Sequence, residues 1–244
     1  MGQILAIGKR ELKAYFTTPL AYVFIVIFVA MNGISAFYFG GFFDRGQADL
    51  VPLFSFQPWL YLFLIPAVAM RLWSEERKTG TLELLMTLPV STTEAVLGKY
   101  LAAWIFIAIS LGLTFPLWIT VNYLGDPDNG VILASYLASL LMAGSYLSIG
   151  GFVSALTRNQ VIAFVIGAVV IFLFMMSGLE LVLSVFQGWA PTLVIDVVQS
   201  VSFLTHYDSI VQGVIDLRDL VFFLLVMGTF LFATVVLVNL KRGA

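Results

Sequence analysis

Long apolar segments alternate with short polar ones along almost the whole chain. Each apolar segment holds 20 or more residues, which is about the length that an α-helix needs to cross the hydrocarbon core of a bilayer. The pattern therefore predicts an all-α polytopic membrane protein, with residues 1–244 forming a single transmembrane domain. The six predicted spans are residues 20–43, 53–72, 100–124, 131–156, 161–186 and 220–240.

The N-terminal stretch, residues 1–16, is amphipathic rather than uniformly apolar. At about 100° per residue, Ile7 and Leu12 fall on one face and Lys9 on the other, with Glu11 as the one acidic residue. A basic amphipathic helix beside a span usually lies in the plane of the membrane interface. We predict either an elbow helix that clamps the bundle and carries force, or a simple topology anchor.

Residues 187–219 connect predicted spans five and six, and they form the longest connection on the predicted external side. Apolar residues recur in it at helical spacing: Val194, Val197, Val198 and Val201. This spacing predicts an external amphipathic helix, either on the membrane surface or re-entrant. We do not predict a seventh span there, because Asp196, His206 and Asp208 would each be costly at bilayer depth.

Composition agrees with this class and excludes several others. Hydrophobic residues make up 61% of the chain and charged residues 11%, whereas soluble domains hold about half and about a quarter. There is no cysteine, no P-loop pattern and no H-E-x-x-H pattern. The sequence therefore predicts no cofactor or metal site and no enzyme activity in this chain, and no nucleic-acid binding.

The distribution of lysine and arginine predicts the orientation. With the N-terminus inside, ten of the 12 basic residues fall on the inner side, and only Arg45 and Arg218 fall outside. Cytoplasmic loops carry such an excess. We therefore predict that both termini are cytoplasmic, and that the polar residues 73–99 between spans two and three are cytoplasmic as well.

Residues 73–99 combine turn and capping signals. Gly80 can absorb a sharp change of direction, Thr81–Thr87 predicts a short helix, and Pro89 ends it. Ser91 and Glu94 then have the spacing of a capping box, which begins a helix running into span three. This region is either a capped intracellular turn or a coupling helix that docks on a cytoplasmic ATPase.

Several polar residues and prolines lie within or near the predicted spans. His206 and Asp208 are interpreted as an interfacial pair rather than a metal or acid–base site, and Glu180 as a carboxylate that reaches water near the end of span five. Asn32 is interpreted as packing glue between helices. Proline residues predict a kink in span three and breaks in span two: Pro116, Pro58 and Pro66.

The motif over residues 73–99 resembles the signature of ABC-2 type transporter permeases. The matching residues are Glu76, Arg77, Gly80, Thr81, Glu83, Leu85, Pro89, Val90, Ser91, Gly98 and Lys99. The likeness extends over the whole chain, and the most similar subgroup is the permease of gliding-motility and nitrous-oxide-reductase-maturation systems. The resemblance implies an ABC-2 fold, similar to type V exporters, with an elbow helix, six spans and a coupling helix.

The resemblance also implies partners and a site. It implies a dimer of cytoplasmic ATPase subunits that binds ATP and Mg²⁺, a second permease (identical or homologous), a possible periplasmic auxiliary protein, and location in a bacterial inner membrane. This chain lacks the large external domain of some relatives. A passive membrane scaffold that anchors another complex is the alternative function. The predicted ATPase-coupling residues are Glu75, Glu76, Arg77, Gly80, Thr81, Leu82, Glu83, Leu85 and Met86.

Overall fold

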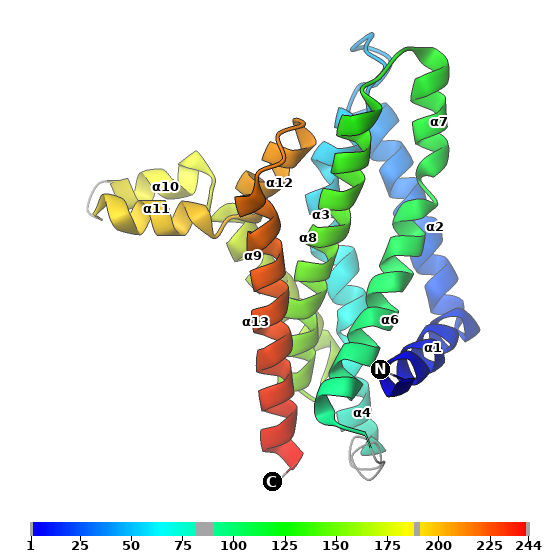
Figure 1. Ribbon diagram of the computed structural model, residues 1–244, viewed down its shortest axis with the longest axis vertical. Helices are drawn as coiled ribbons and strands as arrows, with labels where there is room; N and C mark the ends of the chain where they lie inside the picture. The colour runs from blue at the N-terminus through cyan, green and yellow to red at the C-terminus, as the bar shows by residue number, and fades with distance from the viewer. Residues whose placement is uncertain (1, 82–89, 188–190, 243–244) are drawn as a thin grey trace.

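The computed structural model describes residues 2–81, 90–187 and 191–242, and every element in these ranges is helical (Figure 1). The first half of the chain holds α1 (Gly2–Thr17), α2 (Pro19–Ile34), the π-helix η1 (Ser35–Phe39), α3 (Val51–Ala69), α4 (Arg71–Thr79), α6 (Thr92–Gly112) and α7 (Phe115–Leu124). The second half holds α8 (Asn129–Leu156), α9 (Gln160–Met176), α10 (Glu180–Gln187), α11 (Thr192–Ser200), α12 (Phe203–Val211) and α13 (Leu217–Arg242).

Helices long and apolar enough to cross a membrane confirm the membrane class. Five occur in the described part of the chain, and they cover Ala21–Phe39, Val51–Thr79, Thr92–Leu124, Asn129–Leu156 and Leu217–Lys241. α9 is apolar as well but holds only 17 residues, or about 25 Å at 1.5 Å per residue. The sixth crossing, which we expect at α9, stays a prediction.

The fifth predicted span is wrong as a single helix over 161–186. α9 ends at Met176, and α10 begins at Glu180 after a turn. A Cβ on Gly178 would lie 2.5 Å from Ser202 Oγ, so this turn packs directly against the start of α12. Hydropathy could not show the turn because α10 is also apolar. α10 and α11 instead extend sideways from the bundle in Figure 1.

Other spans differ from the predictions at their ends. The first span closes at Phe39 rather than at residue 43, and the second continues through α4 to Thr79 rather than ending at 72. Pro58 and Pro66 lie within α3 without breaking it. The sequence marks where polarity begins, but a helix continues into water as long as its backbone bonds are made.

The third span bends where the proline predicts a kink. α6 ends at Gly112, and α7 begins at Phe115 with Pro116 in its first turn. Proline has no N–H to donate to the carbonyl four residues earlier, so the helix ladder is interrupted there. Thr114 lies within this interruption, and its Oγ1 donates to Leu111 O at 2.7 Å.

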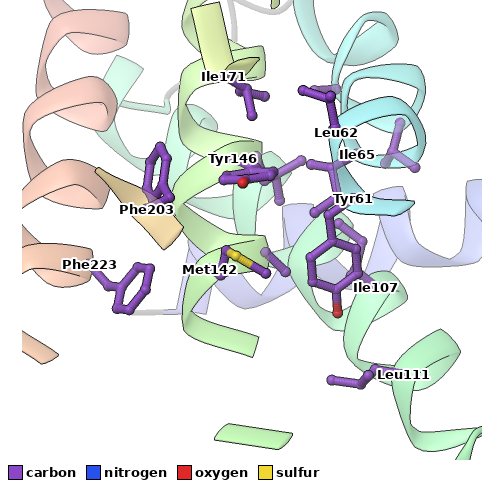
Figure 2. Close-up of a cluster of buried hydrophobic side chains, with 14 of the residues drawn as sticks. Tyr61, Leu62, Ile65, Ile107, Leu111, Met142, Tyr146, Ile171, Phe203 and Phe223 are labelled. Atoms are coloured by element: carbon purple, nitrogen blue, oxygen red, sulfur yellow. The ribbon is translucent and has the colours of Figure 1, made fainter. Parts of the chain in front are cut away.

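α8 is the central helix of the bundle and contacts α3, α4, α6, α9, α12 and α13. Figure 2 shows Met142 and Tyr146 of α8 with side chains of α3, α6, α9, α12 and α13 around them. Small residues permit this crowding, because they let helices approach closely. A Cβ on Gly150, for example, would lie 2.5 Å from the Cβ of Ala69 on α3.

The predicted external segment holds two helices of different character. α11 carries the valine pattern but buries none of its residues. α12 is packed into the bundle, where Phe203, His206 and Tyr207 are buried. The helix predicted at these valines is thus found as α11, whereas α12 is a further helix of the segment that belongs to the core. A position of α11 on the membrane surface, or re-entrant, stays a prediction.

Candidate functional site

The candidate site lies at the end of the bundle where α1, α4, the start of α6 and the end of α13 meet, drawn lowest in Figure 1. We call it the lower end. Glu75, Glu76 and Arg77 lie on α4, and Gly80 caps this helix with a positive φ of 72°. Thr81 follows Gly80, and its Oγ1 lies 2.9 Å from Thr79 Oγ1. The other four predicted coupling residues, and most of the helix predicted over Thr81–Thr87, lie outside the described residues: Leu82, Glu83, Leu85 and Met86.

The junction between α3 and α4 is held on the end of α8 by one hydroxyl group. Ser154 Oγ accepts hydrogen bonds from the backbone N–H groups of Trp73 at 3.1 Å and Ser74 at 3.0 Å, and donates to Met70 O at 2.8 Å. Ser154 is fully buried. Because the junction interrupts the helix ladder, this side chain satisfies the N–H groups of Trp73 and Ser74, whereas Met70 O also accepts from Ser74 Oγ.

Replacing Ser154 by alanine is expected to cost about 1–3 kcal/mol, because buried backbone groups lose their partner. The measurement is thermal unfolding in detergent. Ser110→Ala is the matched control, since Ser110 is equally buried but bonds only to Phe106 O within its own helix. Equal effects of the two substitutions would show that Ser154 does not hold the junction.

Basic side chains join three helices at the last carbonyl groups of α8. Arg77 Nη1 and Lys241 Nζ each donate to Ala155 O at 2.9 Å, and Lys241 also donates to Leu156 O at 3.0 Å. Cations are favourable at a helix C-terminus, where the last carbonyls lack helical partners. These bonds tie α4 and α13 to the same point on α8.

A buried lysine joins the two flanks directly. Lys99 of α6 is 4% exposed, and its Nζ lies 2.7 Å from Glu76 Oε1 on α4 and 3.5 Å from Glu11 Oε1 on α1. The Lys99 ammonium also lies over the ring of Trp73, 5.6 Å from its centroid, within range of a cation–π contact. Three helices therefore depend on one cation.

Glu11, the stray acid on the basic face of α1, has its explanation in this cluster. Burial acts to raise the pKa of Glu11, but Lys99 and Arg10 outweigh it, so the pKa of Glu11 is lowered. The sequence signal was present, since one acidic residue among basic ones suggests an ion pair. Its partner, nearly 90 residues away, could not be identified from local spacing.

The elbow helix crosses α6 at very short range. Ile7 is the buried residue of α1, and a Cβ on Gly98 would lie 2.8 Å from its Cγ2. On the other side of the contact, a Cβ on Gly8 would lie 3.5 Å from Gly98 O. The helical, amphipathic character predicted for residues 1–16 is confirmed. Gly98, the second glycine of the motif, thus permits the close contact between α1 and α6.

The start of α6 is also fixed. Ser91 Oγ accepts from Glu94 N at 3.2 Å and Glu94 Oε2 accepts from Ser91 N at 3.0 Å, which confirms the capping box. Thr92 Oγ1 donates to Asn239 Oδ1 of α13 at 2.5 Å. The two helices that flank residues 82–89 are thus both bonded to the rest of the bundle. α4 is bonded to α8, and α6 is bonded to α1 and α13.

Polar residues elsewhere do not join this site. His206 Nδ1 lies 2.6 Å from Asp219 Oδ1, so the predicted pairing with Asp208 is wrong. The reason is that α12 packs on α13, whereas Asp208 faces away from that contact and is exposed. Glu180 begins α10 and is exposed, and Asn32 is buried and donates to Phe28 O.

The charged side chains of the lower end connect helices to one another. No cluster of three acidic or histidine side chains that could hold a metal occurs in residues 2–81, 90–187 and 191–242. The charged groups at the lower end are instead paired with one another or bonded to helix ends. Such pairs fix the positions of helices.

Together, the apolar helices and the lower-end connections define a multi-pass α-helical membrane protein whose polar region joins several helices. Residues 5–240 match the sequence model of a protein family described as "ABC-2 family transporter protein", and the chain belongs to this family. A search of curated proteins finds no match. The protein is a membrane component of an ABC-2 transporter; such permeases typically lack the ATPase domain and generally partner with an ABC ATPase.

Proposed function

We propose that this permease couples ATP hydrolysis by a separate cytoplasmic ATPase to transport or mechanical work across a bacterial inner membrane. Residues 73–99 would be the docking region, and the lower end would be cytoplasmic, with both termini on that side. The ATPase dimer would bind ATP and Mg²⁺, since no P-loop pattern occurs in this chain. The family match and the excess of basic residues on the predicted inner side support this assignment.

One observation carries the proposal: Glu76 and Lys99 join the two helices that flank residues 82–89. A push on this stretch would act on α4 and α6 together rather than on one helix alone. The connections continue from α4 to α8 through Ser154 and Arg77, and from α6 to α13 through Thr92. Rigid elements joined in this way can transmit a displacement as a unit.

The arrangement also gives α1 a role in the proposed movement. Glu11 lies near Lys99, and Ile7 packs on Gly98. A displacement of α6 would therefore move the elbow helix in the membrane interface. This supports the reading of α1 as a force-carrying clamp rather than as a topology anchor only.

The composition of the complex follows from the family resemblance. We propose two permease chains, identical or homologous, with two ATPase subunits, and a possible periplasmic auxiliary protein. The gliding-motility and nitrous-oxide-reductase-maturation systems are the proposed subgroup, supported by the motif over residues 73–99. A mechanical role or an auxiliary protein would fit the short external segments, which leave little surface for capturing a large substrate.

Replacing Gly80 by proline tests the proposed coupling. Gly80 is exposed and has a φ of 72°, which proline cannot adopt, so the direction of the chain into the docking region must change. We expect the ATPase to remain bound but to hydrolyse ATP at the rate of the ATPase alone. The measurement is permease-stimulated hydrolysis in liposomes that contain the purified complex.

Gly46→Pro is the matched control, because Gly46 is also exposed, has a φ of 61° and lies in the loop between η1 and α3. It should leave the stimulation unchanged. Stimulation that survives Gly80→Pro would contradict coupling through this region. Purification of the wild-type permease without any P-loop ATPase in mild detergent would favour the passive scaffold instead.

A further inference from the structure

Two adjoining cavities lie between the elbow and the second span. The first, of about 240 Å³, is lined by residues of α1, α4 and α6 that include four charged side chains: Glu11, Arg71, Glu75 and Lys99. The second, of about 190 Å³, lies along α2 and α3. Both are lined by Tyr15, Thr18 and Arg71, so they form one continuous groove with a polar end and an apolar end. We call it the elbow groove.

The apolar end runs into the membrane region. Its lining consists mainly of residues from the first two spans and includes Phe24, Ile27, Leu64, Ala67 and Val68. Val23 and Ile27 at its rim are about half exposed, so this end opens towards the hydrocarbon of the bilayer. Within a membrane, an apolar groove of this kind is filled by hydrocarbon chains rather than by water.

The polar end has charges of both signs with unused bonding capacity. Arg71 donates to both oxygens of Glu75, through Nε at 2.9 Å and Nη2 at 3.4 Å, and its Nη1 has no partner among the described residues. Glu11 bonds through Oε1 only, to Arg10 and Lys99, and its Oε2 has no partner in the same ranges. One donor group and one acceptor atom therefore remain.

An amphiphile with a phosphate and an ammonium group fits both ends of the groove. A purely anionic headgroup would be repelled by the carboxylates of Glu11 and Glu75. A purely cationic headgroup would be repelled by Arg71 and Lys99. A zwitterionic headgroup avoids both repulsions, because guanidinium binds phosphate well and a primary ammonium donates to carboxylates. The groove leads from this headgroup site directly to hydrocarbon.

We propose that the elbow groove binds one phosphatidylethanolamine molecule of the leaflet that contacts α1. Its phosphate lies at Arg71, its ammonium at Glu11 and Glu75, and one acyl chain lies along α2 and α3. The lipid then fills the space between the elbow and the second span. This inference does not depend on the proposed partner ATPase.

The test is lipid retention by the purified permease, measured by native mass spectrometry after addition of phosphatidylethanolamine or phosphatidylglycerol with the same acyl chains. We expect one phosphatidylethanolamine per chain, retained about tenfold better than phosphatidylglycerol, as one added charge-assisted hydrogen bond permits. Free glycerophosphoethanolamine, which lacks acyl chains, should not displace it. Equal retention of the two lipids, or displacement by the free headgroup compound, would overturn the proposal.

Paired substitutions locate the site. Ala67→Phe fills the apolar end and Arg71→Gln removes the phosphate donor, so each should abolish retention of the bound lipid. Ala168→Phe on α9 and Arg158→Gln are the controls, because Ala168 is similarly half-buried, Arg158 is exposed, and neither lines the groove. Retention that is lost in the controls or kept in both groove variants would place the lipid elsewhere.

Glu75→Gln gives an outcome that simple misfolding would not produce. Removing one carboxylate frees Arg71 from its pair and removes a partner for ammonium, so the preference should move towards phosphatidylglycerol. Size-exclusion chromatography shows whether each variant remains monodisperse. An unchanged preference for phosphatidylethanolamine in a monodisperse Glu75→Gln variant would contradict the headgroup assignment.

Discussion

Replacing Lys99 by methionine is expected to lower the free energy of unfolding by about 3–5 kcal/mol, the usual cost of removing one partner from a buried ion pair. The methionine keeps most of the apolar contacts of the lysine stem. Glu76, whose side chain is 18% exposed, loses its cation at 2.7 Å, and Glu11 loses the same neighbour. The measurement is thermal or denaturant unfolding of the purified permease in detergent.

The control and a double variant separate charge from packing. Lys13→Met removes an exposed lysine of α1 at the same end and should change stability by no more than about 0.5 kcal/mol. Adding Glu76→Gln to Lys99→Met should restore part of the loss, because the unpaired carboxylate is then removed. If Lys99→Met cost no more than Lys13→Met, Lys99 would not hold the three helices together.

Replacing Gly98 by alanine is expected to displace the elbow helix and to cost about 1–3 kcal/mol, as overpacking of a tight contact does. The new Cβ would lie 2.8 Å from Ile7 Cγ2, 2.9 Å from Ile7 Cβ and 3.2 Å from Ile4 O. Because the Ile7 Cβ and the Ile4 carbonyl belong to the rigid part of α1, rotation of a side chain cannot relieve the clash. The whole helix must move.

Two measurements follow this displacement. Thermal unfolding reports the cost, and limited trypsin digestion reports local opening at Lys9, Arg10 and Lys13 of α1. Gly112→Ala lies on the same helix with nothing within 4 Å of its Cβ, so it should leave both readouts unchanged or improve stability slightly. Equal digestion of the two variants would mean that α1 does not depend on close contact with Gly98.

The class of the protein was predictable from the sequence because hydropathy reports a requirement of the bilayer. A chain with apolar runs of this length must form helices, since lipid offers no partner for backbone groups. The capping box at Ser91 and Glu94 was predictable for a related reason, because its atoms are three residues apart. The family followed from a motif, and the match over 5–240 confirms it.

The predictions that failed concern helix ends and partners. Residues 161–186 look like one span because α9 and α10 are both apolar, whereas in the structure a turn separates them and packs at Gly178 against Ser202. His206 was paired with its neighbour in sequence, whereas helix packing brings it to Asp219. Local patterns do not contain this information, because the partner belongs to another helix.

Residues 73–99, where the coupling function is proposed, show both kinds of information. The sequence by itself determined that a polar segment with a turn at Gly80 and a capped helix start lies between two spans. Only the tertiary structure decided that Lys99 is buried against Glu76 and Glu11, because a charge is stable in such a place only where folding brings its counter-charges. The order of residues determines helices and caps through short-range bonds, whereas ion pairs between helices depend on how the bundle packs.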